Sequence, residues 1–303
     1  MAQYTTANII KLRDQRVAGL IEDVTRGFPL IQNFPAIAVS GTTYNHPNVT
    51  ADAAGEFRAN NAGKTATTAT IGSTTVTLKY FDMSMGPLDT QVANADYNGP
   101  ENAIAVATAS SMRGGMGGLE TQILYGTDAT LGDASGFSGF LQLVDSSMVI
   151  DVEGTATAGC SDVWLVNYEQ TKLILGNDGV LAQDDVVYGP AYDSSGNMYY
   201  AYSQNIGTWA GLTGLKVNGL ARIKNIDTSS GHTLTDDHIY QALALFKVGH
   251  TPNSIVMSRR SLRQLRGSRT ATNATGAPAP IPTEVEGLPI YVSDSCSDTI
   301  AAA

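Results

Sequence analysis

The chain has 303 residues, 43% of them hydrophobic, and a formal net charge of −10. This composition predicts a globular protein with a large core, arranged as one large domain or two intertwined lobes. The negative charge argues against a protein that binds nucleic acid by neutralising phosphates. No apolar run approaches the ~20 residues of a membrane helix, and Cys160 and Cys296 are too few for a disulfide framework, so we expect two free thiols.

Charge is unevenly distributed along the sequence. The residues from Asp133 to Asp193 contain one base, Lys172, among the acids Asp133, Asp145, Asp151, Glu153, Asp162, Glu169, Asp178, Asp184, Asp185 and Asp193. A short later stretch holds five arginines and no acid: Arg259, Arg260, Arg263, Arg266 and Arg269. The acidic block and the basic segment could pair between neighbouring copies of the chain, or form two separately solvated faces.

The first hundred residues predict an arm and a hairpin. Residues 6–27 have apolar residues on one helical face and stop signals at Gly27 and Pro29, which predicts an amphipathic helix. Residues 28–66, rich in proline, asparagine and glycine, predict irregular chain. Residues 74–81 alternate polar and apolar side chains as a strand does, and residues 88–95 follow Gly86-Pro87, so the two are expected to form a polar β-hairpin.

A long helix is predicted next. Asn98-Gly99-Pro100 begins it, Gly126 ends it, and the sequence between is rich in alanine. Its middle contains Gly114, Gly115, Gly117 and Gly118, which predicts either a kink or a second backbone crossing closely.

The rest of the chain predicts mixed α and β structure. Strands are expected at residues 163–168, 172–175, 198–202, 215–226, 254–257 and 288–293. Helices should begin at Thr235 and at Ser258, the second with Leu262 and Leu265 inside and its arginines outside. Residues 270–283 predict an exposed loop.

The sequence offers no recognisable catalytic, cofactor or metal site, so we expect no enzyme. Gly63-Lys64-Thr65 ends like a phosphate-binding loop, but Arg58 stands where its first glycine should be. The four histidines include no pair at metal-ligand spacing, and Gly136-Phe137-Ser138-Gly139 lacks the spacing of a nucleophile elbow.

The order of these parts carries a resemblance. It is found in residues 58–63 (RANNAG), 89–93 (DTQVA), 120–127 (ETQILYGT), 137–141 (FSGFL), 163–167 (VWLVN), 214–217 and 222–227 (GLKV, RIKNID), 255–257 (IVM) and 287–294 (GLPIYVSD). In this order the chain resembles the major capsid proteins of tailed bacteriophages. That resemblance implies an α+β, Hong Kong 97-like capsid fold with an N-arm, an extended β-hairpin loop, a spine helix, and peripheral and axial domains.

The resemblance also implies a division of the chain. Residues 1–60 would form the N-terminal arm, 61–98 the extended hairpin loop, and 99–135 the spine helix and peripheral domain. Residues 136–250 would lie mainly in the axial domain, with the acidic block, and 251–303 would return to the peripheral domain and closing strand. The glycines of the spine depart from the continuous charged helix that is usual in these proteins.

The implied function is an icosahedral shell, built from hexamers and pentamers in the host bacterial cytoplasm, that encloses double-stranded DNA without reading its sequence. The chain begins at the arm without a long charged segment, so a separate scaffolding protein is implied, with a portal, a possible decoration or cement protein, and no membrane. The assembly interface is expected to include Arg58, Asn61, Lys64, Lys79, Asp89, Arg259, Arg260, Arg263 and Arg266. Residues 65–97 would lie over an adjacent subunit.

Two other functions stay open at this point. An encapsulin-like shell would share the fold and enclose a protein cargo. A phage tail or adhesin protein, or an acidic hydrolase, would instead be a small soluble oligomer.

Overall fold

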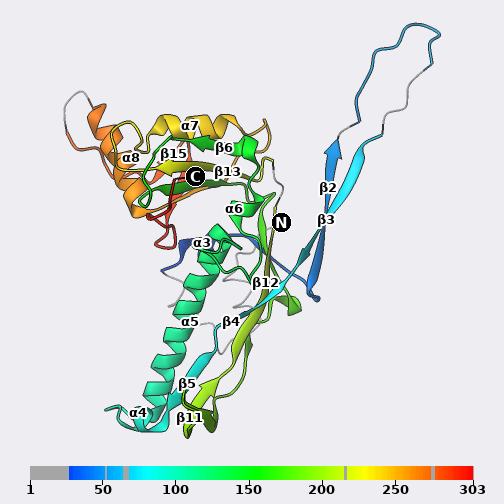
Figure 1. Cartoon of the computed structure of the whole chain (residues 1–303). Coiled ribbons are helices and arrows are strands. Elements are labelled where there is room, and N and C mark those ends of the chain that lie inside the picture. The colour runs from blue at the N-terminus through cyan, green and yellow to red at the C-terminus, as the bar shows by residue number, and fades with distance from the viewer. Residues whose placement is uncertain (1–26, 52, 64–67, 215–216, 274–276, 303) are drawn as a thin grey trace.

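The computed structural model describes residues 27–51, 53–63, 68–214, 217–273 and 277–302. Apart from Gly27, the helix expected over residues 6–27 lies outside this part. Two lobes and a projecting hairpin make up the described chain (Figure 1). We call the lobe around the long helix α5 (Pro100–Tyr125) the helix lobe, and the one around a six-stranded sheet the sheet lobe.

The helix lobe is built on α5, which forms as the sequence predicts. Pro100 begins the helix, and Gly126 ends it with a φ of 55°, a left-handed conformation that favours glycine. The N-terminal end of α5 lies beside α4 (Thr90–Asn94) (Figure 1). Among the described helices, none is long and apolar enough to cross a membrane.

The glycines of α5 neither break it nor admit a second backbone, so both expectations for them are wrong. The helix is continuous, and side chains pack where glycine leaves room. A Cβ on Gly115 would overlap the Met83 side chain, while one on Gly117 would lie 3.2 Å from Cε1 of Phe28. The run of glycines therefore lets neighbouring side chains approach the helix closely.

This packing predicts opposite effects for two adjacent glycines. Gly114 is exposed with no atom near its missing Cβ, so Gly114→Ala should raise the free energy of unfolding by about 1 kcal/mol. Gly115→Ala should lower it by about 1–2 kcal/mol, because Met83 must move. Urea unfolding of the unassembled chain measures both, and a stabilisation of equal size in the two variants would contradict the packing.

Two sheets flank α5. The five-stranded sheet has the order β1 (Ala36–Ala38), β8 (Lys172–Leu175), β12 (Ile206–Thr213), β4 (Lys79–Asp82), with β9 (Ala182–Gln183) also paired to β12. The three-stranded sheet has the antiparallel order β10 (Val187–Tyr192), β11 (Met198–Gln204), β5 (Met85–Asp89). Its attachment to α5 includes a 3.0 Å hydrogen bond from Thr108 Oγ1 to Gln204 Oε1.

The sheet lobe contains the order β15 (Glu284–Val285), β16 (Leu288–Val292), β14 (Ser254–Met257), β7 (Ser161–Val166), β13 (Leu220–Ile226), β6 (Val149–Asp151). The central strand β7 is buried on both faces. Val163 and Leu165 face the core beneath α7 (Asp236–Ala244) and α8 (Arg259–Ala271), while Trp164 and Val166 join the core around α5. Because successive side chains of a strand point to opposite faces, β7 contributes to the cores of both lobes.

Short elements complete the chain: α3 (Pro29–Asn33), α6 (Phe140–Leu143), and the 3₁₀ turns η1 (Ser146–Met148) and η2 (Asn177–Gly179). The strands expected at residues 172–175 and 254–257 form over those residues, and those expected at 163–168, 198–202 and 288–293 form with small changes at their ends. The strand expected over residues 215–226 forms from Leu220, and residues 215 and 216 lie outside the described part.

The expected pairing of the hairpin is wrong. Strand β3 (Thr70–Thr77) pairs with β2 (Thr43–Ala51), and residues 88–95 contribute instead to β5 and α4. Gly86-Pro87 lies inside β5, because β5 finds its partner in β11, far along the chain. Residues 28–66 are correspondingly not irregular throughout, since they contain α3, β1 and β2.

The division expected near residue 250 does not coincide with a change of sheet. Strands β13 and β14, on either side of that point, both pair with β7. Strands β10 and β11, which belong to the expected axial range 136–250, lie beside the N-terminal end of α5, away from the sheet lobe (Figure 1).

Candidate assembly surfaces

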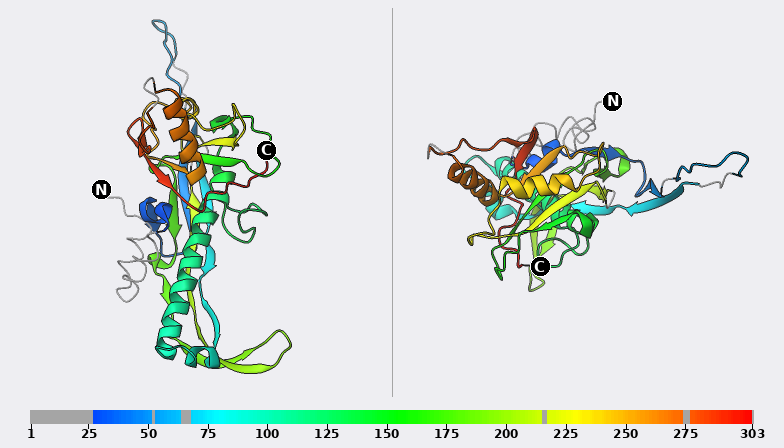
Figure 2. Two further views of the ribbon diagram at one scale, coloured as in Figure 1. Left: turned by 90° about the vertical axis from the view of Figure 1, so that its left-hand side faces the viewer. Right: turned by 90° about the horizontal axis from the view of Figure 1, so that it is seen from above.

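The hairpin of β2 and β3 projects from the body in every view (Figures 1 and 2). Its strands pair from Thr43 opposite Thr77 to Ala51 opposite Thr70. Within β3 only Gly72 and Val76 are half buried, and Val76 packs near Gly211 at the base. Because a two-stranded ribbon is marginally stable alone, this hairpin is expected to gain stability from another molecule.

The hairpin also exposes apolar side chains. Phe57, in the segment between the strands, has a relative exposure of 109%, and Ile71 on β3 has 73%. Apolar side chains on a projecting element favour contact with a partner surface.

The interface residues expected near the hairpin lie in different settings. Arg58 and Asn61 are exposed in the segment between β2 and β3, where Asn61 has a φ of 59° in a turn. Lys64 lies outside the described residues, and Lys79 is exposed on β4 in the body. Asp89 caps α4 by accepting a 2.8 Å hydrogen bond from the Gln91 amide, which gives it a role within its own chain.

A second exposed surface lies on the three-stranded sheet. Tyr188 opposes Tyr202, and Tyr192 opposes Met198, so these side chains share one face with Tyr200. The rings of Tyr188 and Tyr200 stack with centroids 5.3 Å apart, and Tyr192 is 67% exposed. We call these five residues the tyrosine face, whose aromatic composition is typical of protein interfaces.

The arginine helix α8 forms as predicted, with Leu265 buried and Ser258 as its N-cap. Its arginines mostly bind within the chain: Arg259 with Asp294 (2.9 Å), Arg260 with Asp298 (3.4 Å), Arg266 with the Ala279 carbonyl (2.7 Å), and Arg269 with Asp236 (2.8 and 2.7 Å). Arg263 is exposed, and no hydrogen bond or ion pair joins it to another described residue. Pairing of α8 with a neighbouring subunit remains a prediction, best suited to Arg263.

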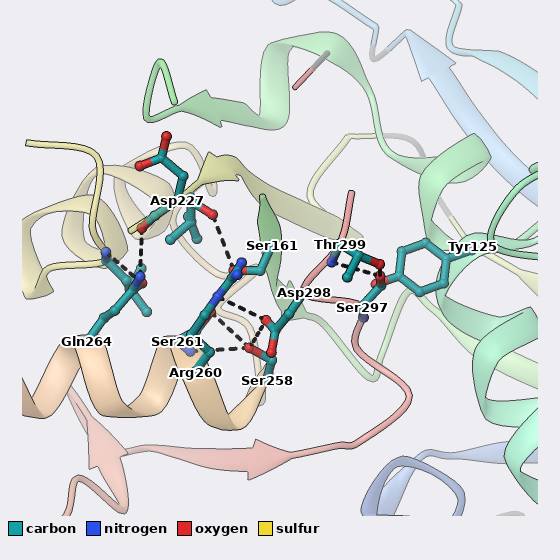
Figure 3. Close-up of polar contacts among 12 residues, drawn as sticks. Tyr125, Ser161, Asp227, Ser258, Arg260, Ser261, Gln264, Ser297, Asp298 and Thr299 are labelled. Atoms are coloured by element: carbon teal, nitrogen blue, oxygen red, sulfur yellow. Dashed lines mark hydrogen bonds and ion pairs between the residues drawn. The ribbon is translucent and has the colours of Figure 1, made fainter. Parts of the chain in front are cut away.

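Figure 3 shows the contact of Arg260 with Asp298 of its own chain. The Ser258 hydroxyl donates a 2.6 Å hydrogen bond to Oδ1 of Asp298, and Arg260 forms its ion pair with the same oxygen. Nearby, the Ser297 amide donates a 2.7 Å hydrogen bond to the Tyr125 hydroxyl (Figure 3). The C-terminal segment is thereby attached to both α8 and α5.

The acidic block does not form one surface, so its expected place in a single lobe is wrong. Asp162 is buried in the sheet lobe, 2.7 Å from Arg222, whereas Asp193 directly follows β10 of the three-stranded sheet. Burial raises the pKa of Asp162 more than Arg222 lowers it. Folding separates these acids because β7 and β10 belong to different sheets.

Glu120 is a central residue of the fold that was not predicted from the sequence. It is fully buried on α5, and its carboxylate accepts hydrogen bonds from the Leu30 amide (2.9 Å), the Ser293 hydroxyl (3.0 Å) and the Ser295 hydroxyl (2.8 Å). Burial raises the pKa of Glu120 despite these bonds. The sequence does carry a signal that Glu120 is buried. Glu120 follows Met116 by four residues, which places it on the apolar face of the helix.

Gln122, also on α5, holds the loop that follows the helix. Its Nε2 donates to the carbonyls of Asp133 (3.2 Å) and Phe137 (2.7 Å), and its Oε1 accepts from the Asp133 amide (3.0 Å). Beside this loop lies a pocket of about 330 Å³. It is lined by β4, α5 and residues 131–137, including Lys79, Phe81, Leu131, Asp133 and Phe137.

The described residues contain no group of three histidine, cysteine or acidic side chains that could hold a metal ion. Cys160 and Cys296 are both buried free thiols, and burial raises the pKa of each. The candidate surfaces for contact with another molecule are the hairpin, the tyrosine face and the pocket.

A projecting hairpin, a long helix and two sheet-based lobes in this order define the Hong Kong 97-like capsid fold that the sequence predicted. Solved structures confirm it. A chain of bacteriophage Epsilon15 aligns with 89% of this chain and 88% of its own, at a TM-score of 0.64 and 14% identity. A chain of the bacteriophage JBD30 capsid covers 90% of this chain and 92% of its own, at a TM-score of 0.51 and 8% identity. No family model and no curated sequence matches the chain.

Proposed function

We propose that this chain is the major capsid protein of a tailed bacteriophage, and that its copies assemble into the icosahedral shell around double-stranded DNA. The observation that carries the proposal is the hairpin of β2 and β3, which projects from the body with apolar side chains exposed. The shared capsid fold supports the same function.

A closed shell is held together by the same contacts repeated between identical copies. Repeated contacts between identical subunits need surfaces that remain unsatisfied in the single chain and find partners in neighbouring copies. The hairpin and the tyrosine face both meet this requirement. A net charge of −10 also suits a wall that encloses DNA without binding it tightly.

Within this proposal, the sheet lobe is the axial domain and the helix lobe the peripheral domain. Copies form hexamers and pentamers, the hairpin lies over an adjacent copy, and Arg263 of α8 meets an acid of a neighbour. A separate scaffolding protein and a portal take part, with a possible decoration protein, and assembly occurs in the host bacterial cytoplasm. The chain needs no catalytic activity for this function.

Electron microscopy of the purified chain, alone and with a scaffolding protein from the same genome, tests the proposal. Closed shells, or rings of five and six copies, are expected. Small oligomers under every condition would contradict it and would favour a tail or adhesin protein. Particles that consistently hold a protein cargo and no DNA in infected cells would favour an encapsulin-like shell.

The tyrosine face gives a separate prediction. Changing both Tyr188 and Tyr200 to serine should leave the single chain folded, because these side chains are 56% and 47% exposed. Loss of the buried aromatic area between copies should raise the concentration needed for assembly by about tenfold or more. Light scattering against protein concentration measures this, with Tyr240→Ser, 45% exposed on α7, as control. Equal assembly of the double variant and the control would exclude the tyrosine face from the interface.

A further inference from the structure

We propose that the pocket beside α5 binds Phe57 from the hairpin of a second copy of this chain. This inference rests on the proposed function, because it specifies where the hairpin meets its neighbour. Phe57 is the most exposed aromatic side chain of the hairpin, and the pocket is a cavity already present in the single chain with aromatic and aliphatic side chains in its lining.

The pocket has the size and lining to receive an aromatic ring. Its volume is about 330 Å³, and Phe81, Leu131 and Phe137 supply an apolar lining. Gly118 also lines the pocket, and the Phe81 ring packs over it, 3.5 Å from where a Cβ would lie, so Phe81 rather than α5 offers the apolar surface there. Polar side chains, among them Thr121, Gln122 and Ser135, complete the lining, and such a mixed cavity can receive one large aromatic side chain.

The pocket is also held in shape before any partner arrives. The three hydrogen bonds of Gln122 fix the loop of residues 131–137 against α5. A wall fixed in this way loses little conformational entropy when a partner binds.

The charges on the two sides are complementary. Arg58 follows Phe57 and is exposed, and Asp133 is exposed at the pocket. Lys79 also lines the pocket. Insertion of the ring would bring Arg58 near Asp133, and an orientation that placed Arg58 beside Lys79 would instead be repulsive.

The donor must be another copy. The hairpin extends away from the helix lobe, so its end does not return to the pocket of its own chain (Figures 1 and 2). A contact in which one copy donates a hairpin and the next accepts it is heterologous, and such contacts form a ring when the rotation between successive copies closes.

Cysteine crosslinking tests the inference. The double variant Arg58→Cys with Asp133→Cys is assembled and treated with a short bismaleimide; the native Cys160 and Cys296 are buried and should react little. A denaturing gel should show a ladder of covalent oligomers, because each copy donates one hairpin and accepts another. A control variant combines Asp133→Cys with Tyr97→Cys, which replaces a fully exposed aromatic residue near the N-terminus of α5. A ladder in the control and none in the Arg58 variant would overturn the inference.

Assembly of Phe57→Ala provides the second measurement. It should require about tenfold or more higher protein concentration than the original chain, whereas Val248→Ala, which removes a side chain 104% exposed in the sheet lobe, should not. Normal particles from Phe57→Ala without the Arg58 crosslink would overturn the pocket contact and leave the proposed function standing. Absence of rings and shells from the unaltered chain would overturn both.

Discussion

Replacement of residues 46–74 by an Asn-Gly turn is expected to leave a folded, soluble chain that forms no shells. Asn45 and Thr75 face each other in the hairpin, so a two-residue turn can join them without changing the base. The removed part makes few contacts with the body, and the free energy of unfolding should change by less than about 1 kcal/mol. The contacts that we propose between the hairpin and neighbouring copies would all be lost.

Sedimentation and electron microscopy measure assembly, and urea unfolding of the same sample checks the fold. The boundaries matter, because a deletion extending to residue 89 would also remove Leu78, Met83 and Met85, which are buried in the body. Loss of assembly in that larger deletion would reflect loss of the core. Intact particles from the 46–74 replacement would show that the hairpin is not needed.

Glu120→Ala is expected to lower the free energy of unfolding by about 3 kcal/mol. The change removes the acceptor of three hydrogen bonds, which join α5 to the Leu30 amide and to Ser293 and Ser295. Buried donors that lose their acceptor account for a cost of this order. Both α3 and the segment after β16 would lose one of their attachments to α5, while the Ser297 amide would keep its hydrogen bond to Tyr125.

Glu120→Gln is the matched control. Its amide oxygen can accept from the Leu30 amide, and its nitrogen can donate to the serine hydroxyls, so the shape and most of the bonding are kept. This variant should be as stable as the original chain at neutral pH, or more so, since it avoids a buried charge. A loss as large as that of the alanine variant would show that the negative charge itself is needed.

The pH dependence follows from the raised pKa of Glu120, for which burial is the largest cause, with Asp294 adding to the rise. The folded chain binds this proton more tightly than the unfolded chain, whose pKa is near 4.5. Between 4.5 and the folded pKa, this group's contribution to stability therefore decreases as pH rises. Urea unfolding across that range should show a less negative slope against pH in Glu120→Gln, and identical slopes would contradict the account.

The elements that sequence predicted well are those with local signals. Pro100 and Gly126 delimit α5, Ser258 caps α8, and the apolar run of β7 predicts a buried strand. These features depend on residues close in sequence, and the physics that fixes them acts over a few residues.

The hairpin shows what local signals miss. Residues 74–81 do alternate as a strand, but Leu78 is buried and divides the run into β3 and β4, which pair with β2 and β12. The partner β2 contains Pro47 and mostly polar residues, so its pattern does not indicate a strand. Pairing over such separations depends on the whole fold.

The interface residues predicted from the sequence lie in two different settings. Arg58 and Asn61 are exposed between β2 and β3, while Asp89 and Arg260 bind within their own chain. Charge in the sequence cannot distinguish these two uses, because both place a polar side chain at the edge of an element. Only the folded arrangement shows which partner each residue has.

The most direct test of the account is an electron cryomicroscopy reconstruction of particles assembled from the purified chain. We expect the hairpin of each copy to lie on the helix lobe of the next copy around a ring. A reconstruction in which every hairpin folds against its own body, with no neighbour in contact, would contradict it.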